Sequence, residues 1–308
     1  MWTLAVPFLA CPHCRNPLEK RGKSTLFCTR CETEFDVTHG IPRLLPATAG
    51  RRSETRTLKA FERQWRSYGT LPRIFGKDEA AMEKNLVGDR LSRRVDRAWY
   101  AGKRVLDAGC GHGRYLRAFR RLGAVVVGID AGRGPEMAGA PKDEDGIAVV
   151  QGSVLALPFR DASFDLVFSD GVIHHTPDPA AAYRELARVV KPGGAVYVWV
   201  YPVEGRLREL VFGGARAITT RLPGPVIRTL SFALAPLTLG VRSYSGTRLG
   251  RATWAECAQV IHDWLAPPLQ SHHTVEEVEG WARDAGLEHA ERLSVPVGVT
   301  AWRPPSTS

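Results

Sequence analysis

Long apolar runs are missing from this chain of 308 residues, since none reaches the roughly 18 residues that a membrane-spanning helix needs. Residues 1–10 are mildly apolar, but no basic residue precedes the apolar stretch, which leads directly into Cys11 and Pro12. Neither a transmembrane helix nor a secretory signal is therefore expected, and the cytoplasm is the expected location. With 44% hydrophobic and 24% charged residues, the composition is typical of a globular protein with one large or two smaller domains.

Acidic residues are scarce relative to basic ones, which leaves a formal net charge of +10. The excess is concentrated in two regions: residues 51–104 hold 15 Lys/Arg against 7 Asp/Glu, and residues 202–252 hold 8 Arg against 2 Glu. Such a charge suits nucleic acid, a membrane surface or an acidic substrate. It indicates either a solvated arginine-rich surface or a basic rim around an active site.

Cysteines are few as well, but four of the six form a pattern. Cys11 and Cys14 make one C-x₂-C pair, and Cys28 and Cys31 make a second after a gap of 13 residues that can hold a hairpin over 18–27. Two such turns can complete a tetrahedral zinc site, and four thiolates leave no open position for a substrate. We therefore expect a structural zinc; two disulfides or a redox pair fit a cytosolic chain less well.

The sequence that follows the cysteine pairs reads FDVTHGIPRLLP over residues 35–46. Together with the two pairs it resembles the Trm112-like zinc ribbon, in which two knuckles precede a GIPxLLP tail. The resemblance covers about residues 4–46, so residues 1–46 are expected to form a zinc ribbon domain. His13 and His39 could replace a cysteine as ligands, but the spacing does not require it.

Residues 105–113, VLDAGCGHG, predict a buried strand, a glycine-rich turn and a helix. The glycines let the backbone approach a ligand closely, and the helix offers its N-terminus. Asp107 would repel a pyrophosphate, which favours a cationic cofactor with ribose hydroxyls. Asp130 ends the next strand, where a carboxylate can accept hydrogen bonds from both hydroxyls of a ribose. The G-x-G-x-G spacing lacks the G-x-G-x-x-G fingerprint of dinucleotide-binding folds.

Beyond residue 103, apolar runs alternate with helical patterns, which predicts an α/β, doubly wound fold. Parallel strands buried on both faces carry their ligands at their carboxyl ends. The expected strands are 104–107, 124–130, 147–151, 164–169 and 195–201, and residues 115–122 lie in the first helix.

Several blocks of this region resemble the class I S-adenosylmethionine-dependent methyltransferases, in particular the UbiE/COQ5-like group. The matching blocks are 105–113, 128–130, 151–159, 164–179 (with FDLVFSDGVIHHTPDP) and 189–200 (with VKPGGAVYVWV). The resemblance covers about residues 100–205. It implies a seven-stranded Rossmann-like sheet of order 3-2-1-4-5-7-6, closed by an antiparallel hairpin built from 288–293 and 297–302.

The resemblance also implies which residues hold S-adenosylmethionine. The implied set is Asp107, Gly109, Cys110, Gly111 and Gly113 at the methionine portion, Asp130 and Ala131 at the ribose, Ser153 and Val154 at the adenine, and Ser169, Asp170 and Gly171 at the sulfonium end. Ser153 departs from the pattern, because the family usually has aspartate there. A serine accepts a hydrogen bond from the adenine amino group without charge assistance, so we expect somewhat weaker adenine recognition.

A histidine pair, His174 and His175, follows the fourth strand at the ligand-bearing edge. The pair either starts a helix and packs, or His175 acts as a base or orients the methyl acceptor.

Earlier in the chain, residues 47–56 read as a linker in which Ser53 could cap the next helix. That helix carries Phe61, Gln64, Trp65 and Tyr68. Either this stripe packs on the main domain, or Trp65 and Tyr68 help to cover the cofactor.

Residues 202–270 interrupt the methyltransferase pattern with arginines, apolar residues and prolines that break the segment into short helices. The segment is either a helical cap over the active site, which implies a sizeable apolar acceptor, or a basic amphipathic surface that contacts a membrane or lipid.

The expected domains are the ribbon 1–46, a linker with helices 47–100, and the methyltransferase domain 101–308 with the cap inserted at about 202–270.

A second histidine pair, His272 and His273, precedes a helix predicted over 275–285, for which Thr274 and Glu277 form a capping box. These histidines either belong to the helix cap or point into the acceptor pocket as catalytic candidates. The surrounding DW…P…HHT…W block resembles uncharacterised zinc-ribbon-linked methyltransferases. A metal site built from the two histidines with His262 and Asp263 is a further alternative.

The leading hypothesis is methyl transfer to a small-molecule, lipid-like or glycan-precursor acceptor. The alternative is an RNA base methyltransferase that uses the ribbon and the basic surface to bind RNA. Residues 169–172, SDGV, lack the N/D-P-P-Y/F pattern of many enzymes that methylate exocyclic amines. An adaptor without enzymatic activity fits least, since the cofactor motifs are nearly intact. The acceptor atom and the oligomeric state do not follow from the sequence.

Overall fold

Five buried parallel strands form the centre of the molecule. The computed structural model describes residues 2–46, 52–71, 78–88, 90–137, 146–203, 205–238 and 253–306. The central strands are β5 (Arg104–Ala108), β6 (Val125–Asp130), β7 (Ile147–Gly152), β8 (Phe164–Asp170) and β9 (Val190–Trp199). Each pairs in parallel with its neighbour in the order β7-β6-β5-β8-β9. The predicted strands are all present, although β9 starts at Val190 rather than at residue 195.

The C-terminal hairpin is also present where the sequence predicts it. Strands β10 (Glu288–Arg292) and β11 (Gly298–Trp302) are antiparallel to each other, and β11 pairs antiparallel with β9. The sheet therefore ends in the order β9-β11-β10.

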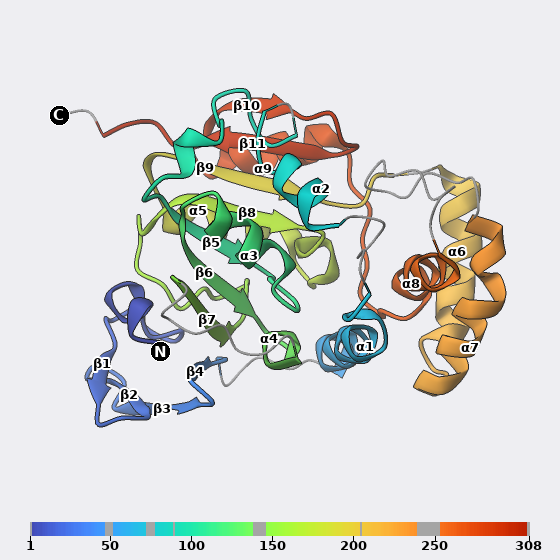
Figure 1. Ribbon diagram of the computed structural model, residues 1–308, viewed down its shortest axis with the longest axis horizontal. Coiled ribbons are helices and arrows are strands. Elements are labelled where there is room, and N and C mark those ends of the chain that lie inside the picture. Colours follow the sequence, from blue (N-terminus) through green and yellow to red (C-terminus); the bar gives the residue numbers. More distant parts are fainter. Residues whose placement is uncertain are drawn as a thin grey trace.

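The N-terminal ribbon is part of the same sheet rather than a separate unit (Figure 1). It follows the short helices η1 (Trp2–Leu4) and η2 (Val6–Phe8), and its strands are β1 (Glu19–Arg21), β2 (Thr25–Cys28), β3 (Thr33–Thr38) and β4 (Ile41–Leu44). Strand β4 pairs in parallel with β7, Arg43 opposite Gln151 and Leu44 opposite Gly152. The sheet therefore has eleven strands instead of the predicted seven, because β4 covers the backbone groups that an edge strand would leave unpaired.

Helices cover both faces of the sheet. They are α2 (Glu79–Lys84), η3 (Ala98–Tyr100), α3 (Arg114–Arg121), α4 (Gly134–Met137), η5 (Ile173–His175), α5 (Pro179–Val189) and α9 (Val275–Asp284). Residues of α2 and α3 share one apolar core with one face of the sheet, and residues of α5 and α9 share another core with the ribbon. The capping box of Thr274 and Glu277 starts α9 as predicted.

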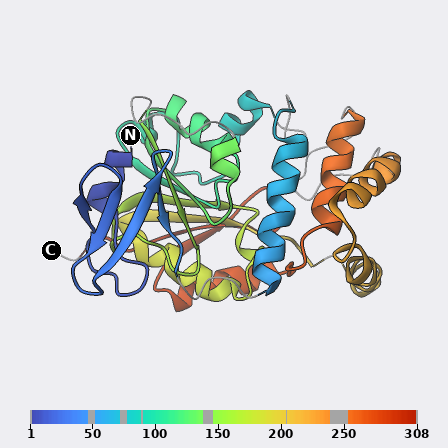
Figure 2. The ribbon, with the colours of Figure 1, turned by 90° about the horizontal axis from the view of Figure 1, so that it is seen from below.

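A long helix, α1 (Arg52–Tyr68), stands between the sheet and the helices of residues 206–265 (Figure 2). Those helices are α6 (Arg206–Thr219), α7 (Gly224–Leu234), η6 (Ala235–Thr238) and α8 (Trp254–Leu265). We call them the cap. Ser53 lies inside α1, so its predicted role as the helix cap is wrong. Residues 47–51 of the predicted linker and 239–252 of the predicted insertion lie outside the described residues. Among the described helices, none is long and apolar enough to cross a membrane.

Candidate active site

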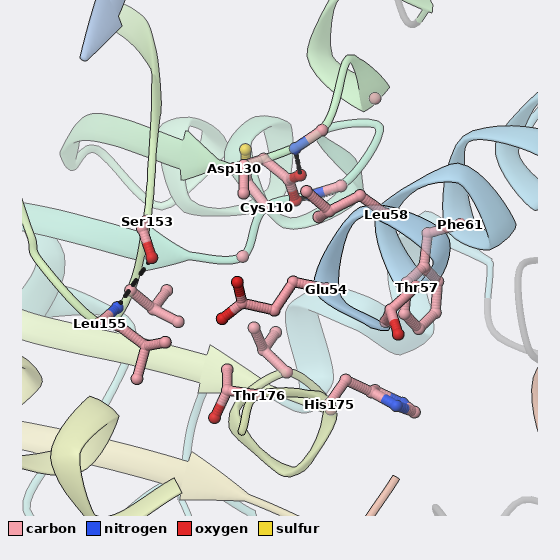
Figure 3. A pocket seen from close by; sticks show the side chains of 18 of the residues that line it. Glu54, Thr57, Leu58, Phe61, Cys110, Asp130, Ser153, Leu155, His175 and Thr176 are labelled. Carbon is pink, nitrogen blue, oxygen red and sulfur yellow. Dashed lines mark hydrogen bonds between the residues drawn. The ribbon is translucent and has the colours of Figure 1, made fainter. Parts of the chain in front are cut away.

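A cavity of about 700 Å³ opens at the carboxyl ends of the central strands. Strands β5, β6 and β8 and the loop after β7 form its floor, and α1 and α8 form its wall. Figure 3 shows the side chains that α1 contributes. The ribbon reaches its edge through Pro12, His13, Leu45 and Pro46. Of the predicted cofactor residues, ten line it: Asp107, Gly109, Cys110, Gly111, Asp130, Ala131, Ser153, Val154, Asp170 and Gly171.

The turn after β5 is held close to its neighbours, and only glycine fits there. Gly109 and Gly111 have φ angles of 90° and 54°, which side-chain-bearing residues rarely adopt. A Cβ on Gly109 would lie 2.4 Å from Val172, and one on Gly111 would lie 2.9 Å from Trp65. Gly113 starts α3 in the left-handed region and does not line the cavity.

Asp107 is a buried carboxyl group without a hydrogen-bond partner at its Oδ2 atom. The residue is 3% exposed, and the Oδ2 atom itself is buried. Burial raises the pKa of Asp107 to about 8; the nearby Arg114 opposes this shift, while Asp170 and Asp130 add to it. An unpaired buried carboxylate is costly in the ligand-free protein, and a cationic group in the cavity would remove that cost.

Asp130 is positioned by two backbone amides. One carboxylate oxygen accepts a hydrogen bond from the Gly111 amide and the other from the Gly132 amide, both at 2.8 Å. Burial still raises its pKa, although these amides act in the opposite direction. A carboxylate has about four acceptor positions, so the two amides leave capacity for two further donors.

At the other end of the floor, the loop after β7 bends back on itself. The Ser153 hydroxyl accepts a hydrogen bond from the Leu155 amide at 3.2 Å, and Val154 lines the cavity beside it. Figure 3 shows the Glu54 side chain reaching from α1 into the space between Asp130 and Ser153. A carboxylate therefore faces the same space from the helix, at the end where the strand loop has only a serine.

Of the three predicted residues at the end of β8, two line the cavity and one holds the sheet together. Asp170 lines the cavity, and its carboxylate accepts hydrogen bonds from Arg114 and from the Tyr197 hydroxyl, each at 3.2 Å. Gly171 lines the cavity beside it. Ser169 is fully buried and donates to the Ala108 carbonyl at 3.0 Å, so it holds β8 to β5 and does not line the cavity.

His175 lines the cavity in a fixed orientation. Its Nδ1 lies 2.8 Å from the Leu269 carbonyl, and because a carbonyl only accepts, Nδ1 carries the proton and Nε2 the lone pair. The ring contacts Phe61 of α1 edge-on, with ring centroids 4.8 Å apart. Burial lowers the pKa of His175, although the charge of Asp263 raises it, so the ring is neutral at pH 7. His174 beside it is fully buried and does not line the cavity.

A further carboxylate, Asp263 of α8, faces the cavity from the cap side. It accepts hydrogen bonds from the Tyr201 hydroxyl and from the Gln64 side chain, the latter at 3.2 Å. Val260 and Trp264 line the cavity beside it. Of the described residues that line the cavity, one is an arginine, Arg114, which is paired with Asp170.

The second histidine pair lies away from the cavity lining. His273 contacts the Ser271 hydroxyl at 2.8 Å and the Glu277 carboxylate at 3.4 Å, and its ring packs edge-on against Trp281. His272 contacts the Gln270 amide at 3.2 Å. Neither histidine lines the cavity, so a catalytic role for them stays a prediction to which the geometry adds no support.

The four cysteines of the ribbon converge. The sulfur atoms of Cys11, Cys14, Cys28 and Cys31 all lie within 4.8 Å of one another. Tetrahedral zinc with Zn–S bonds of about 2.3 Å separates its sulfurs by about 3.8 Å, so the cluster fits such an ion. Among the described residues, no other group of histidines, cysteines or carboxylates has this geometry, which leaves the alternative site around His262 and Asp263 without support.

Several lining residues were not predicted from the sequence as site residues. Glu54, Thr57 and Thr176 belong to no recognisable motif. Arg114 directly follows the glycine turn, and Tyr201 lies two residues after the end of β9, but neither position by itself predicts a site residue. Trp65, predicted either to pack on the main domain or to help cover the cofactor, lines the cavity and stacks on His112 with ring centroids 4.5 Å apart, and its contact with a cofactor stays a prediction. Tyr68 packs into the core of the cap instead.

Comparison with known proteins agrees with this geometry. Residues 106–198 match the methyltransferase domain family. An uncharacterized methyltransferase of Mycobacterium leprae is 33% identical over 185 residues, which are 58% of this chain and 68% of that protein. A ubiquinone biosynthesis O-methyltransferase of Pseudomonas aeruginosa is 40% identical over 107 residues, 33% of this chain and 46% of that protein.

Other relatives are matched over part of their length. Uncharacterized methyltransferases of Mycobacterium species are 34% identical over 156 residues, and this chain spans 62% of their length. Among solved structures, a complex of the Haloferax volcanii Trm112 methyltransferase activator with a methyltransferase is 18% identical, with a TM-score of 0.45 over 83% of this chain and all of that chain. A likeness at that TM-score supports no conclusion about function. The family match and the relative from Mycobacterium leprae show that the chain belongs to the class I S-adenosylmethionine-dependent methyltransferases.

Proposed function

We propose that this protein transfers a methyl group from S-adenosylmethionine to a small-molecule, lipid-like or glycan-precursor acceptor. The observation that carries the proposal is the unpaired, buried Asp107 carboxylate in the floor of a cavity that is large enough for a cofactor and an acceptor. Bound S-adenosylmethionine supplies a methyl group on a positively charged sulfonium centre. The chain itself must orient the two reactants and exclude water.

Three groups of residues hold the cofactor in this proposal. The Asp107 carboxylate pairs with the cationic ammonium group, and the glycine turn lets the backbone lie against the methionine portion. Asp130 accepts hydrogen bonds from the ribose hydroxyls, for which its two backbone amides leave capacity. Ser153 and Val154 contact the adenine, and Glu54 of α1 supplies a carboxylate at the end where Ser153 offers none.

His175 is the base that we assign to the acceptor side. Its Nδ1–H is bound to the Leu269 carbonyl, so its Nε2 lone pair can take a proton from a hydroxyl or amine. Because burial holds its pKa below 6.5, His175 stays able to accept a proton throughout the neutral range. Asp263, fixed by Tyr201 and Gln64, can accept a hydrogen bond from the same acceptor.

The lining of the cavity favours a small acceptor over an RNA base. Residues 51–104 and 202–252 supply the basic excess of the chain, yet among the residues that the structure describes, no lysine or arginine from these regions lines the cavity. Instead α1 and α8 contribute Leu58, Phe61 and Trp264 to the wall. These apolar side chains suit a compact apolar acceptor, whereas binding to RNA depends on arginine and lysine contacts to phosphates.

We also propose that the cysteine cluster holds a structural zinc ion. The four sulfurs are the complete ligand set of such an ion, so no position is left for chemistry. The ribbon is placed to support the cofactor site, because β4 extends the sheet beside β7 and Pro12 and His13 reach the edge of the cavity.

Transfer of a labelled methyl group tests the function. Purified protein is incubated with S-adenosylmethionine carrying a tritiated methyl group and with lysate separated into RNA, lipid and small-molecule pools. We expect label in the lipid or small-molecule pool and a 10²- to 10⁴-fold lower initial rate for His175→Asn, about the contribution of a general base. The variant should still bind S-adenosylhomocysteine, since His175 does not contact the cofactor in this proposal. Label confined to RNA, or none in any pool, would contradict the proposal.

Cofactor binding should also release a proton at neutral pH. The ligand-free protein holds a proton on Asp107 below its pKa of about 8, whereas a cationic ligand favours the ionised carboxylate. At pH 7, binding of S-adenosylhomocysteine should therefore expel a large part of one proton, and the release should vanish above pH 9. Calorimetric titration in two buffers of different ionisation enthalpy measures it. Equal heats in both buffers at pH 7 would show that Asp107 does not pair with the ligand.

A further inference from the structure

The exposed large apolar side chains of this protein are confined to the cap and the segment leading into it. Within the described part of the chain, all of them lie between residues 203 and 254. They are Val203, Leu210, Val211, Ile218, Val226, Leu237 and Trp254. An exposed apolar patch confined to one segment marks an interaction site more often than scattered apolar residues do.

The outer face of α6 is the clearest part of this surface. Leu210, Val211 and Ile218 are 74%, 60% and 66% exposed. Every exposed residue from 210 to 218 is apolar or glycine: Leu210, Val211, Gly214, Ala217 and Ile218. These positions are spaced by three, four and seven residues, which puts them on one side of a helix. We call these five residues the outer face of α6.

The opposite side of α6 is already used for packing. Phe212 and Ala215 pack against the core around α8, and the rings of Phe212 and Trp264 meet edge-on with centroids 5.6 Å apart. The Thr219 hydroxyl donates to the Leu265 carbonyl at 2.8 Å. Helix α6 is therefore apolar on two sides. Packing against α8 explains why the inner side is apolar, but it does not explain the apolar residues of the outer face.

The positive charge of the cap decides between a second copy of this chain and a lipid surface as the partner of the outer face of α6. Residues 205–238 contain five arginines and one glutamate, and Arg221 and Arg228 are exposed. Two copies of such a basic surface would repel each other, whereas anionic lipid head groups would attract it. A helix that combines an apolar face with arginines and does not span a bilayer is suited to lie in the membrane interface.

We propose that the outer face of α6 docks this protein on the surface of an anionic lipid bilayer. The helix lies flat, with Leu210, Val211 and Ile218 in the head-group region, and the exposed Arg221 and Arg228 of the cap contact lipid phosphates. Helix α8 separates α6 from the cavity and lines it with Val260 and Trp264, so docking sets the acceptor side of the cavity close to the membrane. The proposal goes beyond methyl transfer and does not depend on it.

Co-sedimentation of the full-length protein with vesicles tests this docking. We expect binding to vesicles of equal parts phosphatidylglycerol and phosphatidylcholine, and little binding to phosphatidylcholine alone. Raising the salt from 0.1 M to 0.5 M should weaken binding several-fold, because it screens the arginines. The double variant Leu210→Asp with Ile218→Asp should reduce the bound fraction about tenfold or more, since it puts carboxylates into the interface.

Ala290→Asp is the matched control, because it introduces the same charge at an exposed apolar residue of β10, outside the cap, and should leave binding unchanged. Titration with S-adenosylhomocysteine checks that each variant is folded, independently of any methyl transfer. Absence of binding to both vesicles, or equal binding of the double variant, would overturn the proposal. So would a dimer seen by light scattering that the double variant abolishes, since the face would then join two copies of this chain.

Discussion

Replacing Asp107 by alanine should reduce the affinity for S-adenosylmethionine by at least about thirtyfold. The carboxyl group is buried, lacks a hydrogen-bond partner and lies at the carboxyl end of the first central strand, so we expect it to make the strongest electrostatic contact with a cationic ligand. Removing one member of a buried charged pair costs about 2–5 kcal/mol, which sets the expected loss. Calorimetric titration of the purified variant measures it.

Asp107→Asn separates loss of charge from loss of fold. The native state holds the Asp107 proton up to a pKa of about 8, well above the ordinary 3.8, so the carboxyl makes the ligand-free protein less stable as the pH rises through that interval. The asparagine variant lacks this penalty and should unfold at a higher temperature than the wild type at pH 9, yet bind the ligand weakly. Asp161→Ala, an exposed aspartate outside the cavity, is the control for binding. Unchanged affinity in Asp107→Asn would mean that the charge has no role in recognition.

Replacing Cys11 by serine should release the metal and weaken cofactor binding together. Metal content should fall from about one equivalent of zinc to less than half, because three thiolates hold the ion much less tightly than four. The affinity for S-adenosylhomocysteine should fall about tenfold, because the ribbon positions the adenine end of the cavity. Metal analysis and calorimetry on the same preparation measure both effects.

The link between the ribbon and the cavity rests on specific hydrogen bonds. The amide of Ala10 donates to the Pro158 carbonyl at 2.9 Å, directly after the loop that carries Ser153. Arg15, within the first knuckle, pairs at 2.7 Å with Glu185, whose other oxygen accepts from the Leu157 amide at 2.9 Å. Loss of the metal would therefore free this loop.

Cys257→Ser is the matched control, because Cys257 is buried in α8 outside the cluster and should leave the metal content unchanged. Unchanged zinc in Cys11→Ser would refute the metal site. Loss of zinc with unchanged cofactor affinity would refute the coupling.

The sequence predicted those parts of the site that depend on local patterns. The turn around Asp107 and Gly109, the carboxylate of Asp130 and the cysteine pairs each follow from residue types at fixed spacing, and the structure brings them to one cavity or one cluster. Alternating apolar runs located the central strands for the same reason. Ser169 shows the limit of this reasoning: it ends the predicted strand, yet it faces the neighbouring strand instead of the cavity.

The parts of the fold and of the site that the sequence did not predict depend on contacts between segments that are distant in the chain. Gln64 and Asp263 form a hydrogen bond although they are 199 positions apart in the chain. No local sequence pattern therefore predicts that α1 and α8 together form the wall of the cavity. The same holds for the pairing of β4 with β7, which makes the ribbon part of the sheet. Nothing near Ser153 indicates that Glu54 of α1 reaches the same space.

The most direct test of the account is a calorimetric titration of the zinc-loaded wild-type protein with S-adenosylhomocysteine, which cannot react. The account predicts one binding site per chain, with a dissociation constant in the range of about 1 μM to 1 mM that is typical of enzyme substrates. Absence of binding across this range, in a protein shown to be folded and loaded with metal, would contradict the assignment of the cavity to this cofactor.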